Sequence, residues 1–312
     1  MPHRTISVSL TVLPLVSDRM SGRFDIFAEL SRSLERNGAE LRNGDVLVVS
    51  TKYASNSEER ILDMAGVRVS ASGMRLSRRF ALDPKVAEVI LRESGEILGG
   101  MAGFVLATSA PFAPVPGEPL QSSWPGQQRL RRPQGPPSSP PLPAAAAALL
   151  HGVMAPNAGV DTSNIGRGRA ILYPDSPYGT AEALRRKIFL NLGVMAGVIL
   201  ADSRLMPARV GTIGVAVAYA GLDPVLDSRS KPDLDGNPLK VTFQATADAI
   251  ATIANHAMGE GAESRPFVIV RDSGAVLTGR RASPSDVVVP AGQCVYVRGL
   301  SAHAGSDAAS TA

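Results

Sequence analysis

The sequence has few of the features that mark an exported or membrane protein. Its 312 residues include a single cysteine, Cys294, which excludes an internal disulfide and a cysteine-rich metal site. No run reaches the roughly 18 apolar residues that a membrane span needs, and the first residues alternate apolar with polar instead of forming a signal-peptide core. We therefore expect a cytoplasmic protein with no membrane partner.

An excess of one charge is also missing. Lysine and arginine number 32 against 28 acidic residues, and a net charge of +4 over this length is too small for a basic nucleic-acid-binding face. Aromatic residues make up only 4% of the chain, but 44% of it is hydrophobic, which is ample for a folded core. We expect a folded protein, with no nucleic acid as partner and length for about two domains.

Proline, by contrast, is concentrated in one stretch. Residues 111–143 contain 11 of the 24 prolines and are followed by an alanine run to residue 148. Proline at this density removes backbone donors and prevents both helix and central strand. The segment is either a linker between two domains or an insertion at 111–148 within one fold. Beyond residue 300, the Ala, Ser and Gly residues at 301–312 predict a flexible tail.

Elsewhere the hydrophobic periodicity predicts mixed α and β structure. Short apolar, β-branched runs are typical of buried strands, and apolar residues three or four apart indicate helices. Proline at the first helical position and a preceding aspartate mark one of the helix starts. The main predicted strands are 45–50, 194–201 and 267–271, and the main predicted helices are 84–98 and 246–258.

Four polar positions follow predicted strands, turns or helices, where ligands commonly meet a scaffold. Asp161 lies with Ser163 and Asn164 in a polar turn, and Asp202 with Ser203 directly follows the strand 194–201. These oxygen atoms suit a divalent cation. From the residues alone, an ordinary Asp/Asn turn is the favoured interpretation at Asp161, and a helix N-cap is an open alternative at Asp202.

The other two positions carry opposite charges. Glu260 follows the helix 246–258, where an acidic side chain invites a compensating cation, although a solvated glutamate is the default interpretation. Lys52 follows the strand 45–50 and is placed to reach phosphate oxygens, but the chain has no P-loop motif. Spacing and residue type therefore suggest a divalent metal with a phosphorylated ligand, without naming a reaction.

Taken in order, these stretches resemble the coenzyme F420-0:L-glutamate ligase family. The resemblance covers about residues 5–272 and excludes the proline-rich stretch. It is carried by Leu-Pro-Leu at 13–15, Asp-Val-Leu-Val-Val-Ser-Thr-Lys at 45–52, Asp-Pro at 83–84, the run from His-Gly to Asp-Thr-Ser-Asn at 151–164, Asp-Ser at 202–203 and Met-Gly-Glu at 258–260.

The resemblance implies an α+β fold with mainly antiparallel sheets flanked by helices. It also favours one ligase domain over residues 5–300, with 111–148 as a disordered insertion. The implied enzyme is a GTP-dependent ligase that phosphorylates the acceptor F420-0 and joins L-glutamate to it, with γ-linked glutamate in later additions. Two Mg²⁺ or Mn²⁺ ions, an accessory K⁺ and a homodimer belong to the same expectation.

The resemblance also implies roles for single residues. Asp161 and Asp202 are expected to be catalytic. The implied metal ligands are Asp161, Asp202, Ser203 and Glu260. The implied GTP-contacting residues are Leu13, Pro14, Leu15, Val16, Thr51, Lys52, Asn164, Met258, Gly259 and Gly261.

Two departures from the family pattern keep alternatives open. Asn56 stands where many relatives have a second lysine, and the segment 204–209 differs from the Phe-Gly-Arg-Pro-Trp-Arg that often follows the Asp-Thr pair. The second departure permits a related ligase with another phosphorylated acid as acceptor. The first permits a metal- and GTP-binding homologue that does not catalyse ligation.

Overall fold

A computed structural model of the chain describes residues 9–110, 112, 153–289 and 294–296. The expected insertion at 111–148, apart from Phe112, and the expected tail at 301–312 therefore lie outside the described residues. The central sheet has the order β1 (Thr11–Leu15), β12 (Phe267–Arg271), β2 (Val46–Ser50), β8 (Gly197–Leu205) and β9 (Thr212–Ala220). Only the β2–β8 pair is parallel, and the other three pairs are antiparallel.

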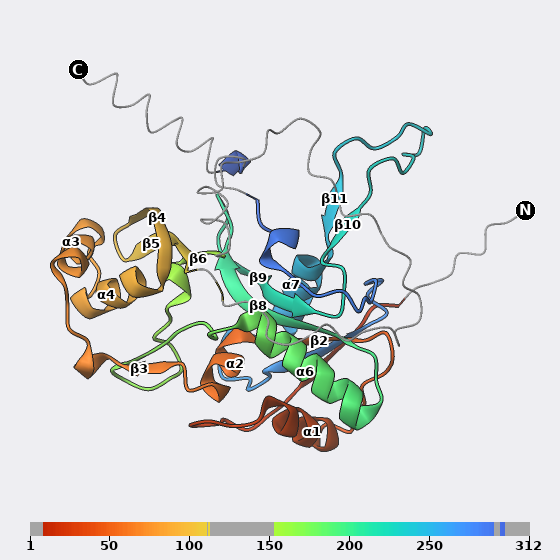
Figure 1. The fold of residues 1–312 in the computed structure, drawn as a ribbon, viewed down its shortest axis with the longest axis horizontal. Coiled ribbons are helices and arrows are strands. Elements are labelled where there is room, and N and C mark those ends of the chain that lie inside the picture. The colour runs from red at the N-terminus through yellow and green to blue at the C-terminus, as the bar shows by residue number, and fades with distance from the viewer. Residues whose placement is uncertain (1–8, 111, 113–152, 290–293, 297–312) are drawn as a thin grey trace, which may run out of the picture.

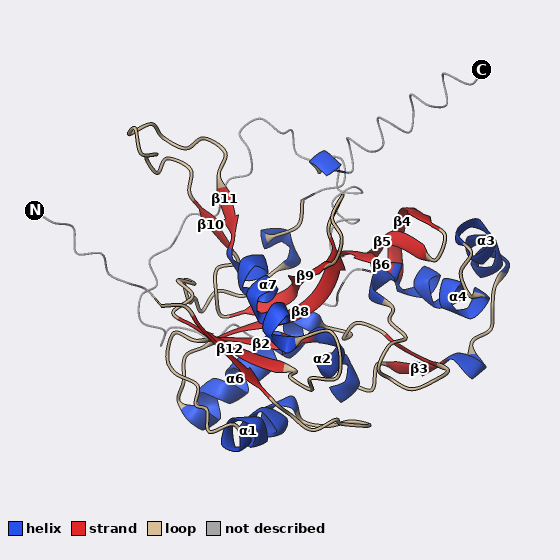
Figure 2. Ribbon diagram, turned by 180° about the vertical axis from the view of Figure 1, so that it is seen from behind, coloured by secondary structure: helices blue, strands red, loops and turns tan. Residues whose placement is uncertain are grey.

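Helices cover both faces of this sheet. Helix α6 (Pro177–Leu192), beside α1 (Ile26–Arg36), packs on one face, and α7 (Thr246–Met258) packs on the other (Figures 1 and 2). Helix α7 approaches closely because β9 carries glycine at position 214, where a Cβ atom would lie 2.2 Å from the Ala251 carbonyl oxygen. The five strands, these three helices and the short α2 (Thr51–Ser57) are called the large lobe below.

A second hydrophobic core lies beside the large lobe (Figure 1). Its buried side chains include Phe80, Ile90 and Val105. The elements around this second core are called the small lobe. Its helices are α3 (Ala71–Phe80), α4 (Pro84–Glu93) and the 3-10 helices η1 (Met64–Gly66) and η2 (Asn157–Gly159). Its strands form an antiparallel sheet of β4 (Ser94–Met101), β5 (Phe104–Ser109) and β6 (Met154–Pro156), and an antiparallel pair of β3 (Ile61–Asp63) and β7 (Arg169–Ile171).

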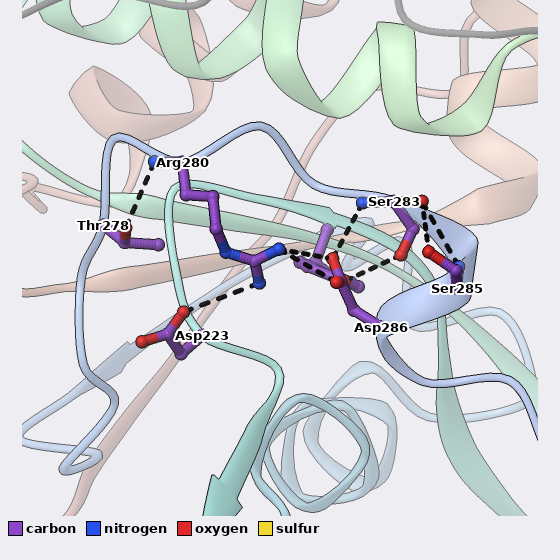
Figure 3. Close-up of polar contacts among 7 residues, drawn as sticks. Asp223, Thr278, Arg280, Ser283, Ser285 and Asp286 are labelled. Carbon is purple, nitrogen blue, oxygen red and sulfur yellow. Dashed lines mark hydrogen bonds and ion pairs between the residues drawn. The ribbon is translucent and has the colours of Figure 1, made fainter. Parts of the chain in front are cut away.

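Two further segments complete the described structure. The antiparallel hairpin of β10 (Val225–Asp227) and β11 (Phe243–Ala245) extends away from the large lobe (Figure 1). Residues 278–287, which include the 3-10 helix η3 (Pro284–Asp286), are held by a polar network (Figure 3). The Asp286 carboxylate accepts from Arg280 Nη1 at 2.9 Å and from the buried Tyr219 hydroxyl at 2.8 Å, which ties this segment to β9.

The predicted α+β class with mainly antiparallel sheets is confirmed. The helix 246–258 and the strand 267–271 have the predicted bounds. The predicted helix 84–98 is too long, because α4 ends at Glu93 and the glycine-containing strand β4, which pairs with β5, begins at Ser94. Within the described residues, no helix is long and apolar enough to cross a membrane.

Candidate active site

A cleft of about 390 Å³ lies between the two lobes. The large lobe contributes α2, the second half of β8 and the start of β9, and the small lobe contributes the start of β5, β6, η2 and the residues around β7. The lining residues are Thr51, Lys52, Ser55, Phe104, Ala155, Pro156, Asn157, Gly159, Val160, Asp161, Ile171, Leu172, Tyr173, Asp202, Ser203, Leu205 and Thr212. Five residues expected from sequence, Thr51, Lys52, Asp161, Asp202 and Ser203, are thereby brought together.

The first polar pair in the cleft joins the two lobes. Lys52 lies in the first turn of α2, and the preceding Thr51 fixes this turn by donating its buried hydroxyl to the Ala201 carbonyl oxygen at 2.9 Å. The Lys52 Nζ atom lies 2.6 Å from Asp161 Oδ2 and 2.9 Å from Ser163 Oγ. A cation from one lobe thus neutralises a carboxylate from the other.

The turn around Asp161 prepares that carboxylate for the charged state. Its oxygen atoms accept from the Ser163 backbone N–H at 2.7 Å and from the Ser163 hydroxyl at 3.0 Å. Burial by itself raises the pKa of Asp161, but the hydrogen bonds from Lys52 and Ser163 outweigh it and hold the pKa below its usual value. Asp161 is therefore an anion at neutral pH.

Asp202 sits in a different setting. It was expected just after a strand, but β8 continues to Leu205, so both Asp202 and Ser203 lie within the strand. The strand continues because its register with β9 resumes after an irregularity at Leu200 and Ala201. Asp202 Oδ2 accepts from the buried Tyr173 hydroxyl at 2.8 Å.

The pKa of Asp202 is shifted in the opposite direction from that of Asp161. Burial raises the pKa of Asp202, and the nearby Asp161 charge acts in the same direction, while Arg204 and the Tyr173 hydroxyl oppose them. Burial also raises the pKa of Tyr173 far above its ordinary value, so this hydroxyl stays protonated and donates. The burial that disfavours the Asp202 anion is the kind of penalty that a bound cation relieves.

The donor set in the cleft suits a magnesium-type ion. Asp161, Asp202 and Ser203 supply two carboxylates and a hydroxyl, and Mg²⁺ commonly takes one or two carboxylates together with substrate phosphate oxygens and water. Across the described ranges, no group of three or more His, Cys, Asp or Glu side chains is close enough to hold an ion. Glu260 therefore does not join the two aspartates in one such group. Its Oε1 atom instead accepts from Asn255 Nδ2 at 3.0 Å and from Thr212 Oγ1 at 3.1 Å.

The other expected nucleotide residues lie outside the cleft lining. Residues 13–15 belong to β1, which pairs with β12, and the Leu15 side chain is buried in the core. Val16 is exposed, and the neighbouring Ser17 N–H donates to the Ser264 carbonyl oxygen at 2.9 Å. The segments 13–16 and 258–264 are thereby neighbours, as one shared ligand would require. The role of both segments in GTP binding stays a prediction.

Four more of these positions lie in a turn or at a helix end. Asn164 has a φ of 59°, and its carbonyl oxygen accepts from the exposed Arg19 side chain at 3.4 Å. Met258 is buried at the end of α7, and Gly259 follows it with a φ of 79°. Gly261 donates its N–H to Glu263 at 2.8 Å. The left-handed backbone at Gly259 thus accounts for the glycine at that position.

Several lining residues carry no signal in the sequence. Tyr173 follows a short strand and belongs to no recognisable motif, yet its hydroxyl reaches Asp202. Ser55, Phe104 and Thr212 likewise enter the cleft only because helix packing and strand pairing place them there. The only sequence signal near this position is a polar residue placed after a predicted strand, and that signal selects Asp202 instead of Tyr173.

Comparison with known proteins gives this geometry a family. A family model described as F420-0:Gamma-glutamyl ligase matches residues 17–272, which is most of the chain and includes every residue of the cleft lining. The chain belongs to the F420-0:gamma-glutamyl ligase family. The family resemblance inferred from the ordered motifs is confirmed.

Individual relatives of this ligase family agree. The protein named coenzyme F420:L-glutamate ligase from Methanopyrus kandleri is 30% identical over 263 residues, covering 84% of this chain and 87% of its own. Its counterpart from Methanothermobacter thermautotrophicus is 29% identical and covers 79% and 82%. The Methanocaldococcus jannaschii protein of the same name is 30% identical and covers 74% and 76%.

Proposed function

We propose that this protein joins L-glutamate to F420-0 in a GTP-dependent ligation. The name of the relatives supports glutamate and coenzyme F420 as the substrates, and the resemblance of the sequence motifs supports GTP as the nucleotide. One observation supports the chemistry in this chain. Lys52, Asp161 and Asp202, which come from three separate segments and two lobes, line one cleft.

The proposed reaction has two steps. A carboxylate oxygen of the acceptor attacks the γ-phosphorus of GTP, the bond from that phosphorus to the bridging oxygen breaks, and GDP leaves. The amine nitrogen of L-glutamate then attacks the carbonyl carbon of the acyl phosphate, the bond from that carbon to the phosphate-bearing oxygen breaks, and phosphate leaves while the nitrogen loses a proton. Later additions would form γ-linked glutamate in the same way.

Positioning and charge compensation supply most of the catalysis in phosphoryl transfer. We infer that Lys52 exchanges Asp161 for a phosphate oxygen, because its Nζ atom already lies at the surface of the cleft. Asp161, Asp202 and Ser203 would then hold divalent cations, Mg²⁺ or Mn²⁺. When bound, such an ion neutralises the triphosphate and the charge that develops in the transition state.

A second acceptor is the alternative that a specific observation favours. Leu205, inside the segment 204–209 that departs from the family pattern, lines the cleft with 53% of its surface exposed. A different side chain at this position, close to Asp202, changes the shape of the cleft that an acceptor would fill. Lys52, Asp161 and Asp202 themselves are unchanged. A related ligase with another phosphorylated acid as acceptor would have this arrangement.

One assay separates the candidates. Purified protein is incubated with F420-0, L-glutamate, GTP and Mn²⁺, and GDP and the glutamylated product are measured by chromatography and mass spectrometry. GDP release that requires both F420-0 and glutamate supports the leading proposal. Turnover only with a different phosphorylated acid supports the alternative acceptor. Tight GTP binding without turnover on any acceptor identifies a non-catalytic homologue.

The replacement at Asn56 does not by itself argue for lost catalysis. Asn56 Nδ2 donates to the Met20 carbonyl oxygen at 2.9 Å, and Asn56 is not a lining residue of the cleft.

By resemblance to the family we also propose a cytoplasmic homodimer. Light scattering on the purified chain tests the dimer, which requires twice the mass of one chain.

A further inference from the structure

We propose that Tyr173 and Arg204 are positioning residues that hold the Asp202 carboxylate in place for a divalent cation. The inference rests on the metal-binding role proposed above for Asp202. It assigns a function to Tyr173, which belongs to none of the motifs expected from sequence, and to Arg204, which opens the segment 204–209 that departs from the family pattern.

The three side chains form a hydrogen-bonded chain. The Tyr173 hydroxyl donates to Asp202 Oδ2 at 2.8 Å and accepts from Arg204 Nη2 at 3.4 Å. Arg204 is itself fixed by a bond from Nη1 to the Met154 carbonyl oxygen in β6 of the small lobe. Because the tyrosine oxygen accepts a hydrogen bond from Arg204 on one side, its own O–H points to the aspartate.

The tyrosine ring has little freedom to move. Its side chain is buried, and a Cβ atom on Gly159 would lie 2.2 Å from ring atom Cε2. The Phe112 ring stands edge-on to it with 6.2 Å between centroids. The Tyr173 carbonyl oxygen accepts from Arg60 Nε at 2.9 Å. Backbone and ring are therefore both fixed, as a residue that orients another side chain requires.

Packing alone does not explain these polar groups. Arg204 is only 8% exposed, and its Nε atom has no hydrogen-bond partner among the described residues. Burying a guanidinium, a phenol and a carboxylate costs more than burying apolar side chains of similar volume. A role in orienting Asp202 accounts for that cost, because the Tyr173 hydroxyl holds one carboxylate oxygen of a residue that lines the cleft.

The test removes one hydroxyl and measures metal binding without turnover. In Tyr173→Phe the ring still fills its place beside Gly159 and Phe112, and only the hydroxyl's hydrogen bonds to Asp202 and from Arg204 are lost. Mn²⁺ is titrated into the full chain in the presence of GDP, and free Mn²⁺ is followed by electron paramagnetic resonance. We expect Mn²⁺ affinity to fall about 10- to 100-fold, the range for losing a partner that orients a metal ligand.

A matched control variant lies elsewhere in the large lobe. Tyr219 is also buried, and its hydroxyl also donates to an aspartate, Asp286 Oδ2, at 2.8 Å, but neither residue lines the cleft. Tyr219→Phe therefore removes a buried tyrosine–aspartate hydrogen bond, together with the contact to the Ser283 carbonyl oxygen at 3.0 Å. It is expected to lower the melting temperature while Mn²⁺ affinity stays at the wild-type value.

The outcomes are separable. Wild-type Mn²⁺ affinity in Tyr173→Phe overturns the proposal, as does an equal loss in Tyr219→Phe or a wild-type chain that binds no Mn²⁺. Ligation is assayed separately on the wild type. A chain that ligates glutamate but shows no effect in Tyr173→Phe keeps the proposed function and loses the positioning role.

Discussion

At the scale of single residues, the cleft holds two aspartates in unlike surroundings. Asp161 is paired with Lys52 and bonded to Ser163, which lowers its pKa, whereas burial raises the pKa of Asp202. A divalent ion beside both would favour the anionic form of each. The pKa values of the two acids are therefore shifted in opposite directions, and in the proposed function a bound cation favours the anion of both.

Replacing either aspartate tests its assignment. We expect Asp161→Ala and Asp202→Ala each to lower the rate of glutamate ligation by more than about 100-fold, beyond the usual effect of residues that only support a ligand. Circular dichroism should show a retained fold, because both residues line the cleft rather than the core. A folded variant with full activity removes that residue from the site.

Gly159 is a position where the backbone and a neighbour both demand glycine. Its φ is 79°, and a Cβ atom there would collide with the Tyr173 ring. We expect Gly159→Ala to lower the free energy of unfolding by about 1 to 3 kcal/mol more than the strain of the positive φ alone. Chemical denaturation of the purified variants measures this difference.

Gly166→Ala is the control for backbone strain. Gly166 has a φ of 93° and nothing within 4 Å of the added Cβ, so this variant carries the strain without the collision. Equal destabilisation of the two variants would contradict tight packing between Gly159 and Tyr173. Reduced Mn²⁺ affinity in Gly159→Ala alone agrees with a displaced tyrosine.

At the scale of secondary-structure elements, one glutamate joins α3 to α4. Ser70 caps α3 by accepting from the Gly73 N–H, and both the N–H and the hydroxyl of Ser70 donate to Glu88 Oε2 on α4, at 2.9 and 2.6 Å. Glu88 also pairs with Arg92 one turn later. The hydrogen bonds from the Ser70 side chain and backbone, together with Arg92, lower the pKa of Glu88 below 4.5.

Glu88→Gln tests this junction and its pH dependence. We expect a loss of about 1 to 3 kcal/mol in the free energy of unfolding at pH 7, because hydrogen bonds to a charged acceptor become neutral. A lowered folded-state pKa gives stability that is complete above the unfolded value of 4.5 and is lost as pH falls through the folded value. The wild-type and variant stability curves should therefore converge in acid.

Denaturation at a series of pH values measures that convergence. Glu35→Gln is the control, because Glu35 is an exposed glutamate on α1. It should change stability by less than about 0.5 kcal/mol. A constant difference between Glu88→Gln and wild type from pH 7 to pH 3 would show that the charge of Glu88 is not what joins the helices.

At the scale of the whole molecule, the two lobes meet around the cleft. In the sequence, the expected insertion lies between β5 and β6. The ends of that interval are close in space. Ser109 N–H donates to the Val153 carbonyl oxygen at 2.9 Å, and the Val153 N–H donates to Ser109 Oγ at 3.0 Å. A short loop is therefore long enough to connect the two strands.

Deleting residues 113–147 tests whether the fold needs them. We expect the shortened chain to keep the sheet of β4, β5 and β6 and to unfold within about 1 kcal/mol of wild type, since loop length has a weak effect on closure entropy. Ligation should persist. A folded, GTP-binding deletion variant without ligation would show that the segment takes part in the reaction.

Sequence alone determined the class of the fold and the family. Local patterns carry that information: the apolar run at β12 and the helical periodicity of α7 depend on neighbours within the same segment, and both have the predicted bounds. Residue type also selected Lys52, Asp161 and Asp202, because few side chains can bind phosphate or a divalent ion. Those choices required no tertiary contact.

Only the tertiary structure decided which of these residues meet. The pairing of β2 with β8 places Thr51 against Ala201, 150 residues away, and the contact between the lobes brings Lys52 to the Asp161 turn. Strand pairing also carried β8 past Asp202. The Tyr173 contact with Asp202 depends on the absence of a side chain at Gly159. Such contacts follow from how separate segments pack, and local sequence patterns do not encode that geometry.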